Sequence, residues 1–470
     1  MRAWARRAAT LHGELAAIAE VDPRWWLLAG GAAVAEASSP RAAYVGSDAE
    51  PGADTFIGHA APPPRDPAAD AITRARAART ALRELDGTLP DQPLAVTLHR
   101  GRETVLQPSA LDAAAFAVGG RVLVASLDDP ALPARLAALV AGATGDDAAA
   151  SDAAGATDSD GPVPFVCVSL GEEPLDTARH GHRRAWRDGC GPWLGLGRAG
   201  GLATCSTCHL VIDGYGHTRI TARIIELTPA APAGAAKAAA PMLPPPAPVA
   251  GAVPLAAAWR ELAMPAPRVL PLAYALGGIL HRRLGHPAAL FSPTLQIPVA
   301  PGRFDDPRRR RHRVISAAVS VRFSGGAPEP YAAFEARARA VLRREAEGVG
   351  LVSRLIAAVR AVPVPLAWKR RGIGTSRPPW LDRVAKVIGG RASLSRIGVD
   401  APCPPLCAVS PPPRLATAAD PLGACVITVV DDGARAAITA CGSGLAGTAV
   451  AAEALLDELL DELPPRPAST

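Results

Sequence analysis

One short segment of the sequence combines an imidazole, a carboxylate and a turn-forming glycine. Residues 208 to 214 read CHLVIDG, so that His209 and Asp213 bracket three apolar residues before Gly214. A histidine at the end of a strand can project into a cleft, where its neutral ring accepts a proton from a hydroxyl, thiol or amine. The segment therefore indicates general-base chemistry at His209. A core histidine followed by a helix-capping aspartate would give the same pattern.

The flanking residues predict a strand before this segment and an amphipathic helix after it. Residues 200 to 227 read GGLATCSTCHLVIDGYGHTRITARIIEL, an apolar run followed by helical spacing of apolar side chains. Residues 434 to 460 read ARAAITACGSGLAGTAVAAEALLDELL and predict the same strand, turn and helix. Few residues are identical between the two segments, so their likeness lies in the pattern alone.

The two segments suggest an internal duplication. Aligning Gly214 with Gly447 offsets them by 233 residues (447 − 214), about half of the 470-residue chain. Gly442 then stands opposite His209, and the second copy has lost the polar pair. A duplicated chain of this kind would be built from two similar halves.

Composition shifts divide the chain near its midpoint. Residues 144–161 are small and acidic and predict a mobile loop, whereas residues 228–254 are rich in Pro and Ala and predict an extended linker. We therefore expect an N-terminal lobe over residues 1–230 and a C-terminal lobe over residues 255–470. Both lobes are predicted to be α/β or α+β, with helices at Ala68–Leu85 and from Pro330 to about Val359 among alternating strands.

Bulk composition narrows the classes of function. The net charge of +6 over 470 residues is a mild basic excess, which does not by itself imply nucleic acid. Eight cysteines in so long a chain are too sparse for a disulfide framework and favour reduced thiols in the cytoplasm. We expect no secretion signal, since acidic residues interrupt the N-terminal apolar run, and no transmembrane helix.

With its surrounding strand and helix, the H-x-x-x-D-G pattern of His209, Asp213 and Gly214 resembles the superfamily of chloramphenicol acetyltransferase, dihydrolipoyl acyltransferases, condensation domains and wax ester synthases. The resemblance covers about 30 residues. It implies two chloramphenicol acetyltransferase-like lobes that form a pseudo-dimer, with a degenerate motif in the second lobe. It also implies that His209 is the general base, that Asp213 holds the loop through a salt bridge and that Gly214 makes the turn. Many two-lobed members have a second histidine where this chain has Cys208.

The implied reaction moves an acyl group from a thioester to a hydroxyl or amine. The donor would be acyl-coenzyme A or an acyl carrier protein, with a small-molecule acceptor, no tightly bound cofactor and no metal. Ser410, in the sequence CAVSPPP, is a candidate oxyanion donor, although a serine in a Pro-rich turn would look the same. We expect a monomer. A trimer or larger shell would instead indicate a dihydrolipoyl-type core subunit, and a third reading is a non-catalytic member of the same fold.

Other chemical side chains have plainer interpretations. The pairs Cys205 with Cys208 and Cys403 with Cys407 could form a thiolate zinc site, but buried thiols are common core fillers. Cys208 could also be a nucleophile. His217 is expected to contact solvent or a groove wall. The basic run at residues 308–313 is expected to be a solvated loop, with phosphates of coenzyme A or a carrier as its alternative partners.

Overall fold

The computed structural model describes about half of the 470 residues. The described ranges are 43–44, 54–87, 96–99, 102–105, 111–118, 121–144, 166–173, 194–199, 201–208, 214–228, 256–284, 294–299, 315–350, 354, 392–399, 404–409, 425–442 and 449–464. Among these residues every helix is too short or too polar to span a bilayer.

The first half of the chain forms a mixed sheet with the strand order β2-β9-β8-β7-β5-β6, extended beyond β2 by a further strand, β16. β7 is parallel to both β8 and β5, and the other adjacent pairs are antiparallel. The strands are β2 (Asp54–Ala60), β5 (Ala113–Val118), β6 (Arg121–Ser126), β7 (Val166–Glu173), β8 (Leu194–Ala199), β9 (Leu202–Cys208) and β16 (Cys407–Val409).

The second half forms a six-stranded mixed sheet with the order β10-β18-β17-β15-β11-β12. Here β15 is parallel to both β17 and β11, and the remaining pairs are antiparallel. The strands are β10 (Ala256–Leu262), β11 (Thr294–Val299), β12 (Ile315–Ser320), β15 (Ala392–Gly398), β17 (Cys425–Asp431) and β18 (Ala436–Gly442).

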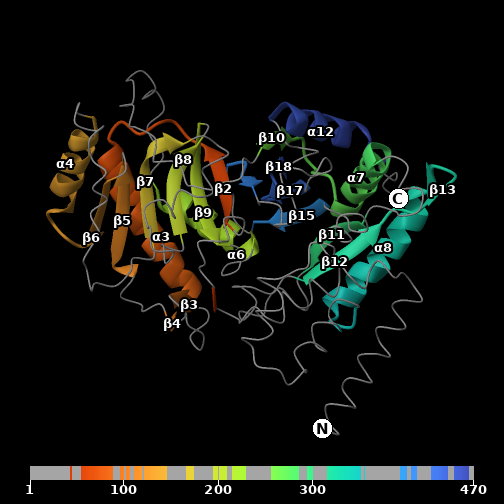
Figure 1. Ribbon diagram of the computed structural model, residues 1–470, viewed down its shortest axis with the longest axis horizontal. Coiled ribbons are helices and arrows are strands. Elements are labelled where there is room, and N and C mark those ends of the chain that lie inside the picture. Colours follow the sequence, from red (N-terminus) through yellow and green to blue (C-terminus); the bar gives the residue numbers. More distant parts are fainter. Residues whose placement is uncertain are drawn as a thin grey trace, which may run out of the picture.

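The two sheets repeat one another strand for strand. In each, the first strand of the lobe pairs antiparallel with the last strand of the lobe, one further antiparallel pair follows, then two parallel pairs and then a final antiparallel pair. The helices repeat as well: α3 and α7 follow the first strand, α4 and α8 follow the final hairpin, and α6 and α12 follow the last strand. The predicted fold of two similar mixed α/β lobes is therefore confirmed (Figure 1).

Strand register corrects the predicted alignment by one residue. Cys208 ends β9 opposite the first residue of β2, and Gly442 ends β18 opposite the first residue of β10. Gly442 is thus the counterpart of Cys208, with an offset of 234 residues (442 − 208), and Ser443 follows it where His209 follows Cys208. The alignment on glycines differs by one residue because Gly214 lies six residues after the end of its strand, whereas Gly447 lies five residues after the end of its own.

Each sheet is covered by helices whose apolar sides form a core. The helices are α3 (Pro67–Gly87), α4 (Leu132–Thr144), α6 (Gly214–Leu227), α7 (Val269–Leu284), α8 (Tyr331–Ala346) and α12 (Ala449–Asp461). Along α3, Ala71, Ala75, Ala78 and Leu82 recur at helical spacing and are fully buried against the first sheet. In the second lobe, α7, α8 and α12 cover one face of the sheet (Figure 1).

Two small sheets complete the described strands. One is formed by β1 (Ala43–Tyr44), β3 (Val96–His99) and β4 (Arg102–Val105). The other is the hairpin of β13 (Phe323–Ser324) and β14 (Ala327–Pro328), which precedes α8.

The helix predicted from Pro330 to about Val359 is wrong at its end. α8 stops at Ala346 because Gly348 adopts a left-handed backbone, with a φ of 74°. The amide of Val349 donates to the carbonyl of Arg344, and that of Gly348 donates to the carbonyl of Glu345. This pair of hydrogen bonds around a left-handed glycine is a common way for a helix to end, because it satisfies the last carbonyl groups of the helix.

One strand crosses between the lobes. β16 comes from the second half of the sequence, yet it pairs with β2 of the first sheet, with Ala408 opposite Ile57. The predicted lobe boundaries at residues 228–254 do not anticipate this crossing, and most of that segment lies outside the described residues. The acidic segment 144–161 also lies almost entirely outside them.

Candidate active site at the β9–α6 junction

The structure describes both elements that flank the predicted motif. β9 ends at Cys208 and α6 begins at Gly214, so the predicted strand and helix are both present. His209 and Asp213 lie between them, outside the described residues. The roles predicted for these two residues therefore stay predictions.

Gly214 begins α6 against the second lobe. A Cβ atom built on Gly214 would lie 3.0 Å from Cδ1 of Ile397 on β15, closer than side chains normally approach. The helix can therefore start at this point only with a glycine or with a displaced Ile397. The first residue of α6 therefore packs directly against β15 of the second lobe.

Ser410, the candidate oxyanion donor, directly follows β16. The carboxyl end of β16 lies on the same side of the first sheet as the carboxyl end of β9. Phe56 of β2 pairs with Ser206 on one side and with Val409 of β16 on the other. β9 and β16 both run antiparallel to β2, so they run in the same direction and are about 10 Å apart, two strand spacings. His209 and Ser410 directly follow these two strands. Ser410 itself lies outside the described residues.

His217 is buried, in contrast to the predicted solvent contact. It is only 1% exposed, and its Nε2 lies 2.9 Å from the carbonyl oxygen of Cys205 on β9. Because a carbonyl oxygen can only accept, Nε2 carries the proton and donates it. A buried polar ring is costly unless it is hydrogen-bonded, and this bond ties α6 to the strand before the motif.

Cys205 has the properties of a core residue. Burial raises the pKa of its thiol to about 11, partly offset by a hydrogen bond with Thr221 and by the charge of Arg74. The thiol therefore stays protonated at neutral pH, whereas zinc and nucleophilic chemistry need the thiolate. The side chains of Cys208, Cys403 and Cys407 lie outside the described residues. Within the described ranges no three His, Cys, Asp or Glu side chains are grouped to hold a metal.

A small apolar cluster joins the two lobes beside this site. It contains side chains from β2 and α6 of the first lobe, from β15 and β17 of the second, and from the crossing segment. Its members are Ile57, Ala222, Ile225, Ile397, Val399, Leu406, Ala408 and Val430. Since β16 lies against β17 and β18 as well as pairing with β2, the crossing strand fills the space between the sheets.

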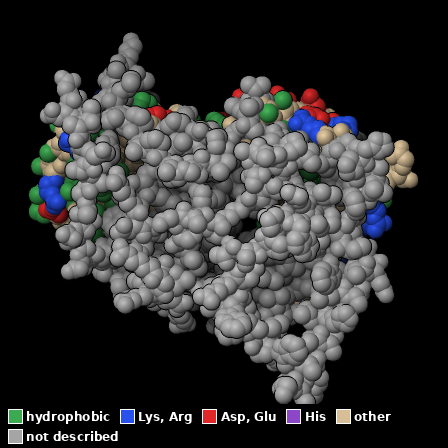
Figure 2. Space-filling model, viewed as in Figure 1, with side chains coloured by type: hydrophobic (Ala, Val, Ile, Leu, Met, Phe, Trp, Pro, Cys, Tyr) green, Lys and Arg blue, Asp and Glu red, His purple; other side chains and the backbone are tan. Residues whose placement is uncertain are grey.

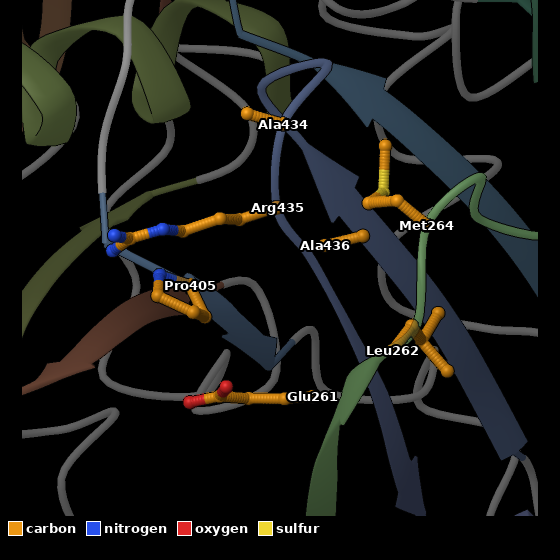
Figure 3. Close-up of a pocket in the computed structure, with 7 residues that line it drawn as sticks. All are labelled: Glu261, Leu262, Met264, Pro405, Ala434, Arg435 and Ala436. Atoms are coloured by element: carbon orange, nitrogen blue, oxygen red, sulfur yellow. The ribbon is translucent and has the colours of Figure 1, made fainter.

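A pocket of about 320 Å³ opens at the far end of the crossing segment. It is lined by Glu261, Leu262, Met264, Pro405, Ala434, Arg435 and Ala436. In Figure 3 the side chains of Arg435 and Glu261 extend toward the side on which Pro405 lies. Pro405 precedes Val409 by four residues, or about 13 Å of strand, so the pocket is separate from the edge at which β9 ends.

A buried cation of the first lobe was not anticipated from the sequence. Arg74 of α3 is 8% exposed and donates to the carbonyl oxygens of Gly197 and Thr204, at 3.1 and 3.0 Å. Burial lowers the pKa of Arg74 and raises that of nearby Asp70. The signal was available, because position 74 falls on the apolar stripe of α3, three residues after Ala71.

Charged side chains of the second lobe gather over α12 and its neighbours (Figure 2). Arg260 of β10 contacts Asp457, while Arg282 and Arg283 of α7 contact Glu458. These pairs are exposed and of mixed sign, so they present no single-sign field at this surface.

Comparison with known proteins gives likenesses in structure alone. No protein-family model matches the sequence, and no curated protein matches it. The structure is similar to the first condensation domain of the CDA synthetase, at 13% identity and a TM-score of 0.37, over 87% of this chain and 90% of that one. It is also similar to the starter condensation domain of rhizomide synthetase RzmA, at 11% identity and a TM-score of 0.37, over 88% and 90%.

Proposed function

We propose that the protein is an acyltransferase that moves an acyl group from a thioester to a hydroxyl or amine, with His209 as the general base. The observation that carries the proposal is the placement of the strand that precedes His209. β9 ends at an edge of the first sheet, and the helix after the motif begins against Ile397 of the second lobe. This placement of β9 and α6 supports a position for His209 near the junction of the two lobes, where two substrates could meet.

In this reaction His209 takes the proton from the acceptor as the acceptor attacks the thioester carbonyl. The carbonyl oxygen becomes an oxyanion, and collapse of the intermediate expels the thiolate, which regains the proton from His209. The products are one ester or amide and one thiol. Ser410 would donate a hydrogen bond to the oxyanion, which is supported by the common direction and common edge of β9 and β16. Asp213 would hold the loop.

The donor would be acyl-coenzyme A or an acyl carrier protein, and the acceptor a small molecule. We propose a monomer, because the two similar lobes already pair within one chain through β16. The pairing of lobes that a dihydrolipoyl-type subunit obtains by oligomerisation would here be internal.

The test is release of free thiol from a panel of acyl-coenzyme A thioesters with mixed alcohols and amines. We expect His209→Ala to lower kcat/KM by about 100-fold or more, since general-base catalysis contributes factors of that size. His99→Ala is the matched control, because His99 lies in β3, which belongs to neither large sheet.

Three outcomes separate the alternatives. Turnover lost only in His209→Ala, with unchanged circular dichroism, supports the proposal. Equal turnover in both variants means that His209 is not the base. No turnover with either coenzyme A or carrier-bound donors favours a non-catalytic member of the fold.

A further inference from the structure

Residues 209–213 of the motif lie between two elements, β9 and α6, that are tied directly to each other. On the strand side, Cys205 lies four residues before His209 and is paired within the sheet to Ile57 and Leu196. On the helix side, His217 lies four residues after Asp213. The bond of 2.9 Å from His217 Nε2 to the Cys205 carbonyl oxygen therefore joins the two elements on either side of residues 209–213.

Two further contacts hold the first turns of α6. The hydroxyl of Thr221 donates to the carbonyl of His217 at 2.9 Å and is also hydrogen-bonded with the Cys205 thiol. Gly214, the first residue of α6, lies against Ile397. The first turns of α6 thus have one anchor on β9 and another on the second lobe.

The chemistry of His217 is specific for this task. An apolar side chain of similar size would fill the same space, but it could not donate to a carbonyl that already belongs to a central strand. Among the described residues of α6, the buried polar side chains are His217, Thr218 and Thr221, and of these three His217 is hydrogen-bonded to a backbone atom of another element. Its hydrogen bond joins the helix directly to the backbone of the strand.

We infer that His217 is a positioning residue that sets the placement of the His209 side chain through the β9–α6 tie. This inference rests on the proposed function and deepens it. A displacement of about 1 Å in a catalytic group can cost about 100-fold in rate, so a hydrogen bond between the two elements that flank His209 is well placed to control turnover.

Three variants test the inference in the full-length protein. His217→Leu removes the donor and keeps an apolar filling, and His217→Gln restores an N–H that can reach the same carbonyl. His281→Leu is the control, because His281 is a partly buried histidine of α7 that stacks on Phe323 in the second lobe. Each variant is measured for kcat, KM and the melting temperature.

We expect kcat of His217→Leu to fall about 100-fold with KM for the thioester within about threefold, and His217→Gln to recover most of the loss. His281→Leu should lower the melting temperature without this loss of kcat. If His217 had only a structural role, His217→Leu would have a lower melting temperature but an unchanged kcat at temperatures well below melting. That result would overturn the inference.

A second readout does not depend on turnover. In spectra of protein labelled with ¹⁵N-histidine, the ring signals of His209 are identified by their absence in His209→Ala. We expect them to shift in His217→Leu and to return in His217→Gln. If the wild type shows no turnover, the proposed function fails while these signals still test the positioning. Unchanged His209 signals in His217→Leu overturn the inference in either case.

Discussion

Buried polar side chains in the first lobe make its stability depend on pH. His59 of β2 has its Nδ1 buried without a hydrogen-bond partner among the described residues. Burial, together with the smaller effects of the charges of Arg74 and Arg198, lowers the pKa of His59 to about 4. The ring is therefore neutral in the folded protein at physiological pH.

We expect the stability contributed by neutral His59 to be lost as the pH falls. The pKa is about 4 in the folded state and 6.5 in the unfolded state, so between these values the unfolded chain binds the extra proton. This contribution is complete above pH 6.5 and declines as the pH falls toward 4. The measurement is the melting temperature of the wild type and of His59→Leu at pH values from 7.5 to about 4.5.

The melting temperature of the wild type should fall relative to that of His59→Leu as the pH decreases from 6.5 toward 4, whereas above pH 6.5 the two should differ only by a constant offset caused by the changed packing. A difference between the proteins that stays constant over this range would show that His59 does not titrate in the expected window. The comparison cancels the acid sensitivity of the exposed ion pairs, which both proteins share.

Adjacent glycines in α7 offer a test at the level of an element. A Cβ atom on Gly277 would lie 2.6 Å from Cγ2 of Val321, which is fully buried, whereas one on Gly278 would meet only the side-chain ends of Arg282 and Glu462 at 3.6 and 3.9 Å. We expect Gly277→Ala to destabilise the protein by about 1–3 kcal/mol through overpacking. Gly278→Ala should stabilise it by about 0.5–1 kcal/mol, because alanine loses less entropy in a helix.

Urea unfolding of the two alanine variants measures both effects against the wild type. Since the substitutions are chemically identical and adjacent, a general effect of helix propensity would move both in the same direction. Equal stabilisation of the two would mean that α7 does not approach Val321 as closely as described.

The strands and helices around the motif could be predicted because their apolar spacing is local. The helix at Ala68–Leu85 is present as α3, and the duplicated strand and helix are present in both lobes as β9 with α6 and β18 with α12. The pairing of β16 with β2 joins residues some 350 positions apart, and no local pattern encodes such a contact. The burial of His217 was missed for a similar reason, since its partner Cys205 belongs to another element.

At the scale of the whole molecule, the crossing segment couples the lobes. Leu406 is 1% exposed at the centre of the apolar cluster between them. We expect Leu406→Ala to cost about 2–5 kcal/mol and, because the lost packing lies between the lobes, to separate their unfolding. Calorimetry should show one transition for the wild type and two for the variant.

Leu455→Ala is the matched control, because Leu455 is equally buried but lies within the core of the second lobe. It should lower the transition temperature without dividing the transition. A single, equally lowered transition in both variants would mean that Leu406 contributes to stability without coupling the lobes.

The crossing strand also makes the two large sheets differ at their edges. β16 covers the outer edge of β2, whereas the corresponding edge of β10 has no added strand among the described residues. A fragment that ended before β16 would expose the backbone of β2 as an open template for aggregation. If the gene is divided within residues 228–254, the first half should therefore be soluble only when both halves are expressed together. The second half would then supply β16 as a separate chain and act as a chaperone for the first.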